Sequence, residues 1–156
     1  MSYVDSVLQP GEVVLGRTRL HWFIYLRSLF LLLLALGVYV ATVGFAPENQ
    51  LYFSFGALAL GAIGLIYFLG AWIKRATTEL AVTDRRVIHK TGFFKRETQE
   101  MNREKVESVD VEQSLAGRLF GYGTVLVRGT GSTWEPFANI AGALAFRSHI
   151  TAASNT

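Results

Sequence analysis

The chain has 156 residues, enough for one domain or for one small domain with an additional element. Hydrophobic residues make up 51% of it and charged residues 17%, whereas a typical soluble domain carries roughly 25% charged residues. The absence of cysteine excludes disulfides and cysteine-ligated metals, and a net charge of +3 is too small to indicate a nucleic-acid-binding protein.

Residues 1–21 form a polar-to-mixed segment that precedes the first long apolar stretch. Within it, residues 11–20 alternate, with Val13 and Leu15 on one side and Val14 and Gly16 on the other. This pattern allows an extra strand that pairs with the C-terminal domain, although the chain would have to leave that domain and return to it. A flexible or interfacial segment is the alternative, and the sequence leaves both open.

Two apolar stretches are long enough to cross a membrane. Residues 28–46 give 19 uncharged residues and residues 51–73 give 23, against about 20 needed for a bilayer core. The first span can begin at Trp22 if the Arg27 side chain reaches the interface. We therefore predict transmembrane helices over residues 22–46 and 51–73.

Residues 47–50 (Pro-Glu-Asn-Gln) predict a tight turn, so the two spans should form an antiparallel hairpin with both chain termini on one side. The turn has no Lys or Arg, whereas basic residues flank the other ends of both spans. The positive-inside rule then places both termini in the cytoplasm. The basic residues concerned are Arg17, Arg19, Arg27, Lys74, Arg75, Arg85 and Arg86.

The second span carries small residues at helical spacing, and Ala57, Gly61 and Gly64 are the candidate helix-packing residues. Small residues at this spacing let two helices approach closely, either within the hairpin or between copies of the chain. Neither span has an ionisable residue in its interior, so nothing in the sequence indicates a proton relay or an ion pathway.

After the second span the hydrophobic pattern changes to a period of two, typical of strands. Strands are expected over residues 78–83, 86–91, 95–101, 106–113, 124–128 and 133–137, followed by a helix that Asn139 would cap. The predicted fold class is therefore an α+β membrane protein. A two-helix transmembrane hairpin precedes a small antiparallel β-barrel or sandwich that a C-terminal helix caps.

Three stretches resemble the bacterial pleckstrin-homology family found in YdbS-like membrane proteins. They are Pro10-Gly11-Glu12, the run Thr83-Asp84-Arg85-Arg86-Val87, and the stretch Gln113-Ser114-Leu115-Ala116-Gly117-Arg118-Leu119-Phe120-Gly121-Tyr122-Gly123-Thr124. The resemblance implies a bent antiparallel sheet of seven strands closed by a C-terminal helix, over residues 74–156. It also implies a multi-pass protein of the bacterial inner (cytoplasmic) membrane. It supplies no set of functional residues.

The sequence shows no arrangement typical of catalysis. His21, His89 and His149 are far apart and lack metal-ligand spacing, and neither a nucleophile elbow nor a phosphate-binding loop is present. The paired glycines at 121–123 and 129–131 lie between predicted strands, as turn glycines do. We predict no enzyme activity, no cofactor and no metal.

Basic residues gather just after the second span. Residues 74–96 contain seven Lys and Arg against two acidic residues, and each basic residue near an anionic membrane contributes about 1 kcal/mol of attraction. The candidate membrane-surface contacts are Lys74, Arg75, Arg85, Arg86, Lys95 and Arg96. Ordinary positive-inside bias with a solvated hairpin explains the same residues. Phe93 and Phe94 could pack in a core or against a second subunit, or dip into the interface.

The sequence favours a non-enzymatic, membrane-anchored binding or scaffold module. It would self-assemble as a homo-oligomer and recognise a protein partner or anionic lipid headgroups. The alternative is an accessory subunit of a larger membrane transport or envelope-maintenance complex, in which the hairpin supplies the function. The expected partners are the lipid bilayer, a second copy of the chain, and a membrane protein, with no nucleic acid.

Overall fold

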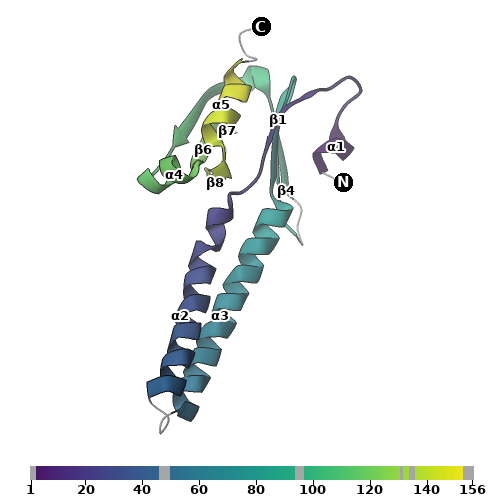
Figure 1. Ribbon diagram of the computed structural model, residues 1–156. Coiled ribbons are helices and arrows are strands. Elements are labelled where there is room, and N and C mark those ends of the chain that lie inside the picture. Colours follow the sequence, from purple (N-terminus) through teal and green to yellow (C-terminus); the bar gives the residue numbers. More distant parts are fainter. Residues whose placement is uncertain (1–2, 46–49, 94–96, 131, 134–135, 153–156) are drawn as a thin grey trace. The chain divides into compact units, whose positions relative to one another are not determined.

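A computed structural model of the protein describes residues 3–45, 50–93, 97–130, 132–133 and 136–152 (Figure 1). The chain divides into two compact units. Residues Trp22–Ile73 form one unit, here called the hairpin, and Met1–His21 with Lys74–Thr156 form the other, here called the β-domain. The β-domain is therefore built from both ends of the chain, and the hairpin is inserted into it.

The hairpin consists of a short 3-10 helix η1 (Trp22–Tyr25), helix α2 (Leu26–Phe45) and helix α3 (Gln50–Thr77). These bounds agree with the predicted spans 22–46 and 51–73, except that α3 continues to Thr77. Most of the predicted turn at 47–50 lies outside the described residues. Hydroxyl groups inside the helices bond to their own backbone, since Ser28 Oγ donates to Tyr25 O (2.7 Å) and Thr42 Oγ1 donates to Val38 O (2.6 Å).

The three candidate helix-packing residues lie on the face of α3 that meets α2, and the two helices run side by side (Figure 1). Ala57 is buried, and a Cβ added at Gly61 would lie 3.8 Å from Ala35. At Gly64 the same Cβ would lie 3.1 Å from Leu32, closer than most such contacts. Small residues at these positions therefore serve packing within the hairpin itself.

The first sheet of the β-domain has four antiparallel strands in the order β1-β2-β3-β4. They are β1 (Val14–Thr18), β2 (Glu79–Thr83), β3 (Arg86–Thr91) and β4 (Glu97–Asn102). Of the two alternatives for residues 11–20, the structure has the strand, because β1 pairs with β2 from Val14↔Thr83 to Thr18↔Leu80. The N-terminal segment is thus part of the C-terminal fold.

The second sheet is built around β6 and contains β5 (Val106–Glu112), β6 (Tyr122–Gly129), β7 (Ser132–Thr133) and β8 (Phe137–Ala141). Of the single strand predicted over 133–137, Thr133 ends β7 and Phe137 begins β8, while residues 134–135 lie outside the described residues. Asn139 does not cap a helix, because it lies within β8, where Ala141 pairs with Tyr122. Strand β8 ends before Gly142, which has a left-handed conformation (φ 60°), and helix α5 (Ala143–Ala152) begins at the next residue.

The two sheets meet where β1 ends, and they do not close into a barrel. Leu20 forms an isolated bridge with Ile140, and Thr18 Oγ1 donates to Ala141 O (2.6 Å). The described residues contain eight strands, against seven implied by the resemblance and six predicted from the pattern; the two beyond those six are β1, from the N-terminal segment, and one of the pair β7 and β8. Helix α5 packs against both sheets, with Phe146 and Ile150 buried.

Both faces of the first sheet are covered, which explains why nearly all of β2 is buried. Leu80 and Val82 face the second sheet and α5, as strand alternation requires. On the opposite face, Ala81 and Ile88 pack against Val4 of a short N-terminal helix, α1 (Tyr3–Val7). Sequence patterning did not predict α1.

Candidate functional site

Two of the motifs that carry the family resemblance meet in one polar network. Arg86, at the start of β3, donates from Nε to Glu12 Oε1 and from Nη2 to Glu12 Oε2, both at 2.9 Å. Thr83 Oγ1 donates to Glu12 Oε1 (2.7 Å) and the Gln9 N–H donates to Glu12 Oε2 (2.8 Å). The Pro-Gly-Glu stretch is thereby fastened to the Thr-Asp-Arg-Arg stretch more than seventy residues away.

The electrostatics of this network are those of a buried ion pair. The Glu12 side chain is fully covered, and that of Arg86 is 12% exposed. The hydrogen bond from Arg86 lowers the pKa of Glu12 to about 2, and the Gln9 and Thr83 donors act in the same direction against the effect of burial. The hydrogen bond to Glu12 likewise raises the pKa of Arg86. Both groups are therefore charged at neutral pH, and their role is structural.

Arg86 has to be removed from the set of candidate membrane-surface contacts. Besides Glu12, its guanidinium donates to Glu100 Oε2 (2.6 Å) and to Val7 O (2.8 Å). A cation that already has these partners and is mostly buried cannot reach a headgroup without breaking the network. Lys95 and Arg96 lie outside the described residues.

The remaining described members of the set lie at opposite ends of β2. Lys74 and Arg75 stand just before the strand, whereas Arg85 follows it in the turn to β3. At about 3.3 Å per residue, six residues of extended chain separate these positions by roughly 20 Å. The structure therefore does not bring the sequence-predicted basic residues together in one patch.

The chain leaves and re-enters the β-domain at adjacent points, His21 and Lys74, and we call this region the junction end. Arg75 Nε donates to Leu20 O (3.1 Å), which ties the two connections together. The His21 N–H donates to Asn139 O (2.7 Å), and the His21 ring stacks on Tyr122 with centroids 5.4 Å apart. Burial lowers the pKa of His21, and the nearby Arg75 charge adds to this effect.

A short helix, α4 (Leu115–Phe120), lies beside the junction end, between β5 and β6. Ser114 caps it, since Ser114 Oγ accepts from the Gly117 N–H (3.1 Å), and Gly121 (φ 77°) ends it in the left-handed conformation. The glycine-bearing stretch between β5 and β6 thus contains a capped helix as well as the turn glycine Gly121. A Cβ at Gly117 would lie 2.6 Å from Tyr122 O, so this face of α4 must be bare to pack on β6.

Large apolar side chains are exposed on the other side of α4. Leu115 is 84% exposed and Leu119 is 80% exposed, and Phe120 is also exposed. The stretch from Gln113 to Thr124 carries a family motif, but the sequence pattern did not predict that Leu115 and Leu119 are exposed. A signal was available, because no acidic residue occurs between Gln113 and Thr133 while Leu115 and Leu119 are one helical turn apart.

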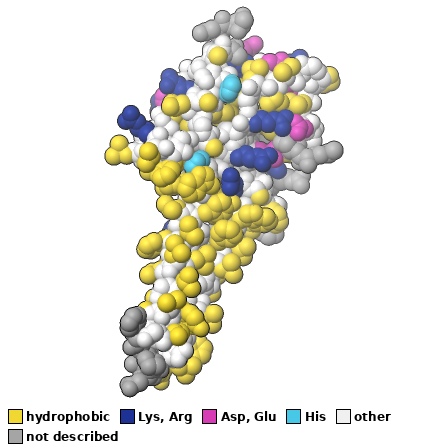
Figure 2. Space-filling view, in the orientation of Figure 1, with side chains coloured by type: hydrophobic (Ala, Val, Ile, Leu, Met, Phe, Trp, Pro, Cys, Tyr) yellow, Lys and Arg dark blue, Asp and Glu magenta, His cyan; other side chains and the backbone are white. Residues whose placement is uncertain are grey.

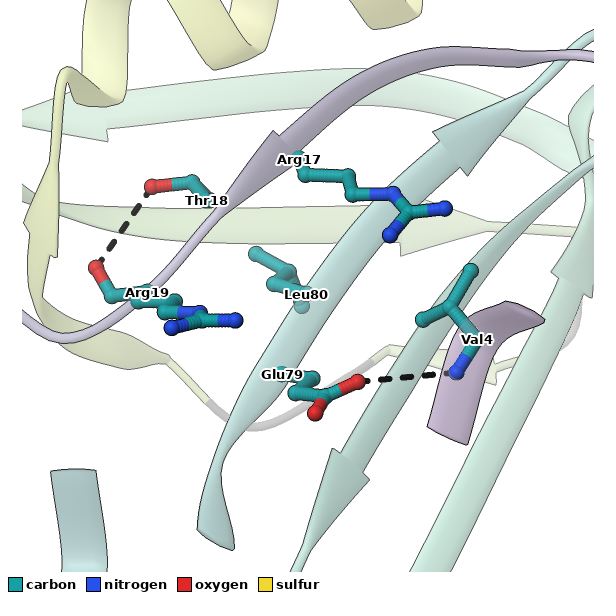
Figure 3. A pocket seen from close by; sticks show the side chains of 6 residues that line it. All are labelled: Val4, Arg17, Thr18, Arg19, Glu79 and Leu80. Carbon is teal, nitrogen blue, oxygen red and sulfur yellow. Dashed lines mark hydrogen bonds between the residues drawn. The ribbon is translucent and has the colours of Figure 1, made fainter. Parts of the chain in front are cut away.

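A small hollow opens between β1, β2 and α1, and its lining is partly polar (Figure 3). Arg17 forms an ion pair with Asp5, and the Val4 N–H donates to Glu79 Oε2 at 3.5 Å. The remaining lining residues are Thr18, Arg19 and Leu80. These polar contacts hold α1 against the sheet, and the lining contains no pairing of acid, base and nucleophile.

The histidines do not assemble into a site. His89 is buried beside Phe137, with ring centroids 4.2 Å apart, and burial lowers its pKa to about 4. His149 lies on α5, where its ring occupies the space that a side chain at Gly16 would take. Within the described residues, no group of three or more His, Cys, Asp or Glu side chains is arranged to hold a metal ion.

Two antiparallel sheets with a C-terminal helix, interrupted by the two helices of the hairpin, make up the described chain. Residues 22–154 match the family described as Bacterial PH domain. The match covers most of the chain, and the protein therefore belongs to the bacterial PH domain family, as its motifs indicated. No curated protein and no solved structure matches the chain significantly. The match begins after β1 and Glu12, although both complete the fold.

Proposed function

We propose that this protein is a non-enzymatic, membrane-anchored binding module whose hairpin crosses the bacterial inner membrane and whose β-domain stands at the cytoplasmic surface. One observation carries the proposal: the two apolar helices are hardly buried within the molecule. Only 11% of the most apolar window of each is buried, whereas a core helix of a soluble protein is mostly buried, and this difference supports a membrane span. Figure 2 shows hydrophobic side chains over the visible face of the hairpin.

The dimensions of the hairpin fit a bilayer. The candidate spans contain 23 and 28 residues, and at 1.5 Å per residue both exceed the roughly 30 Å of a hydrocarbon core. Phe30, Leu58 and Ile66 are each at least 65% exposed, an arrangement that is costly in water and favourable in lipid. Trp22 and Trp72, also exposed, stand where the chain enters and leaves the hairpin, as interfacial aromatic residues do.

The orientation follows from the basic residues at the junction end. Lys74 and Arg75 lie directly after the hairpin and Arg19 precedes it, which favours a cytoplasmic β-domain. We propose that Lys74 and Arg75 contact anionic headgroups of the same membrane. The opposite end of the β-domain, where Arg85 is exposed in the turn between β2 and β3, is here called the distal end. It is then free to recognise a protein partner.

The absence of native cysteine allows a direct test of this topology with single-cysteine variants. Gln50→Cys places a thiol at the start of α3, and Thr98→Cys places one on the exposed β4 strand. In intact spheroplasts, a membrane-impermeant maleimide should label position 50 and leave position 98 unlabelled until the cells are lysed. Labelling of position 98 in intact spheroplasts, or recovery of the full chain in the soluble fraction, would overturn the proposal.

A second candidate function is that of a subunit in a larger membrane assembly or a homo-oligomer. Four glycines of the hairpin favour it, because within the described residues no atom lies within 4 Å of the place where a Cβ would stand. They are Gly37 and Gly44 on α2, and Gly56 and Gly70 on α3. Such positions allow another helix to approach. Native mass spectrometry after gentle detergent extraction distinguishes a second protein at fixed stoichiometry, a homo-oligomer and a monomer, and a monomer would count against this candidate.

A further inference from the structure

We propose that helix α4 is a second, interfacial membrane contact, which inserts Leu115 and Leu119 into the headgroup region of the bilayer that the hairpin crosses. This inference rests on the proposed function, because it requires the hairpin to span the membrane. It concerns a different part of the chain, and the spans themselves do not require it. In this proposal, lipid covers the exposed apolar face of α4.

Helix α4 is held rigidly on the β-domain. Its N-terminus is capped by Ser114 and its C-terminus by Gly121, and Gln113 Nε2 donates to Tyr122 O (2.9 Å) at its base. Gly117 faces β6 without room for a side chain. Since Leu115 lies two residues from Gly117, it points to the opposite side of the helix, and Leu119 shares that side one turn later. The two leucines are therefore held outward by the fold.

Helix α4 also lies close to the point where the chain leaves the β-domain. Gly121, the C-terminal cap of α4, accepts a hydrogen bond from the Gly142 N–H (2.9 Å), and the next residue, Tyr122, stacks on His21. His21 is the last residue of the β-domain before Trp22 opens the hairpin. Helix α4 thus lies, with its C-terminal cap, beside the residues through which the chain leaves the β-domain for the proposed membrane span. In Figure 1, α4 and the start of α5 lie at this same end of the β-domain.

Exposed apolar side chains are unevenly distributed over the described part of the β-domain. Those at least 38% exposed are Val13, Leu15, Phe93, Leu115, Leu119, Phe120 and Leu144. Leu144 opens α5 directly after Gly142, and Phe93 follows β3 at the end of the sheet where β2 begins. Five of the seven therefore belong to elements at the junction end, whereas Val13 lies at the distal end, where its N–H donates to Asp84.

The charge around α4 favours lipid over a second apolar protein surface. The exposed Arg118 lies on α4 between the two leucines in sequence, and no acidic residue occurs from Gln113 to Thr133. A short helix with apolar side chains on one side and a cation at its edge is suited to the boundary between headgroups and acyl chains. Lys74 and Arg75 at the same end supply further attraction for anionic headgroups.

The test uses full-length protein reconstituted in vesicles that contain phosphatidylglycerol, with one environment-sensitive fluorophore on a single cysteine. Three variants are compared: Leu119→Cys on α4, Val13→Cys at the distal end, and Leu33→Cys on the exposed face of α2. Each probe is exposed to aqueous iodide and to lipids with a spin label at a shallow or a deep position. All three side chains are at least 58% exposed, so the substitutions do not disturb a core.

The expected result is that deep spin labels quench the probe at position 33, shallow spin labels quench the probe at position 119, and neither quenches the probe at position 13. Iodide quenching at position 119 should be at least about fivefold weaker than at position 13, as for a side chain 5–10 Å inside the interface. Adding Leu115→Asp to the Leu119→Cys variant should restore most of the iodide quenching, while position 33 stays in lipid.

Three outcomes would overturn the proposal. If the probe at position 33 escapes lipid quenching, the hairpin does not span and the proposed function fails with this inference. If position 33 is quenched by lipid but position 119 is as open to iodide as position 13, the hairpin spans and α4 is not in the interface. Protection of position 119 from iodide without quenching by lipid would show that α4 packs against protein instead.

Discussion

The ion pair between Glu12 and Arg86 should be the main fastening of the N-terminal segment to the rest of the β-domain. Replacing Glu12 with Gln keeps the shape of the side chain and removes its charge. The amide keeps one acceptor oxygen and presents a donor in place of the other, so Arg86 retains Glu100, the Val7 carbonyl and at most one of its two 2.9 Å bonds to residue 12, now to a neutral acceptor. The variant should therefore weaken the docking of β1 and leave the hairpin unchanged.

The magnitude follows from burial. Breaking a buried pair by removing one partner costs about 3–5 kcal/mol, whereas an exposed pair contributes about 0–1 kcal/mol. The Arg86 side chain is 12% exposed and keeps other acceptors, so the cost should lie somewhat below the buried range, at about 2–3 kcal/mol. At 1.4 kcal/mol per factor of ten, this corresponds to about 30- to 150-fold faster opening of β1.

Hydrogen exchange of the β1 and β2 amides, followed by mass spectrometry on the full-length protein in nanodiscs, measures this opening. The variants Glu12→Gln, Arg86→Met and the double substitution complete a cycle that isolates the energy of the pair. The amides of α3 provide the internal control. A coupling energy below about 0.5 kcal/mol, the value of an exposed pair, would refute the buried ion pair as the fastening.

The same variant carries a pH signature with a defined sign. The folded pKa of Glu12, about 2, is lowered from its ordinary 4.5, so the unfolded segment binds more protons between these values. The stabilisation is complete above pH 4.5 and is lost as the pH falls toward 2. Protection of β1 should decline over this window in the wild type, and this component should be missing in Glu12→Gln. An equal decline in both proteins would show that other groups cause it.

Three further predictions concern single positions. His89 is buried and its pKa is lowered to about 4, so the β-domain should lose stability as the pH falls from 6.5 to 4. His89→Phe should reduce this loss, which hydrogen exchange of the β3 amides at each pH measures. Gly117→Ala should distort α4, because its Cβ would meet Tyr122 O at 2.6 Å. The opening free energy of the α4 and β6 amides, measured by hydrogen exchange, should fall by about 1–3 kcal/mol. Unchanged exchange of these amides would contradict the contact. In the hairpin, Gly64→Val should loosen the α2–α3 contact in cysteine cross-linking, whereas Gly56→Val, with open space around it, should have no effect.

Much of the secondary structure could be predicted from local patterns. The two apolar helices and the first five strands of the C-terminal part all lie close to their expected positions. These elements are recognisable because hydrophobic period, length and glycine turns act over a few residues. The family could likewise be recognised, since Thr83–Val87 and Gln113–Thr124 are contiguous stretches, and the family match confirms it.

The errors fall where distant contacts override local signals. Asn139 followed by an apolar stripe indicates a capped helix, but pairing of Ala141 with Tyr122 extends the strand and delays the helix to Ala143. Arg86 was grouped with surface cations because sequence cannot show that Glu12 lies beside it. The outward face of α4 depends on Gly117 packing on β6, which is also a contact between separate elements.

The amino-acid sequence by itself determined where long apolar helices form, where strands alternate and which family the chain belongs to, because these properties reside in short stretches. Only the tertiary structure decided that the chain's first strand completes a sheet with residues from its second half, and that cations near in sequence separate to opposite ends of a strand. The physical reason is that hydrogen bonding and burial between distant segments select among local conformations of nearly equal energy.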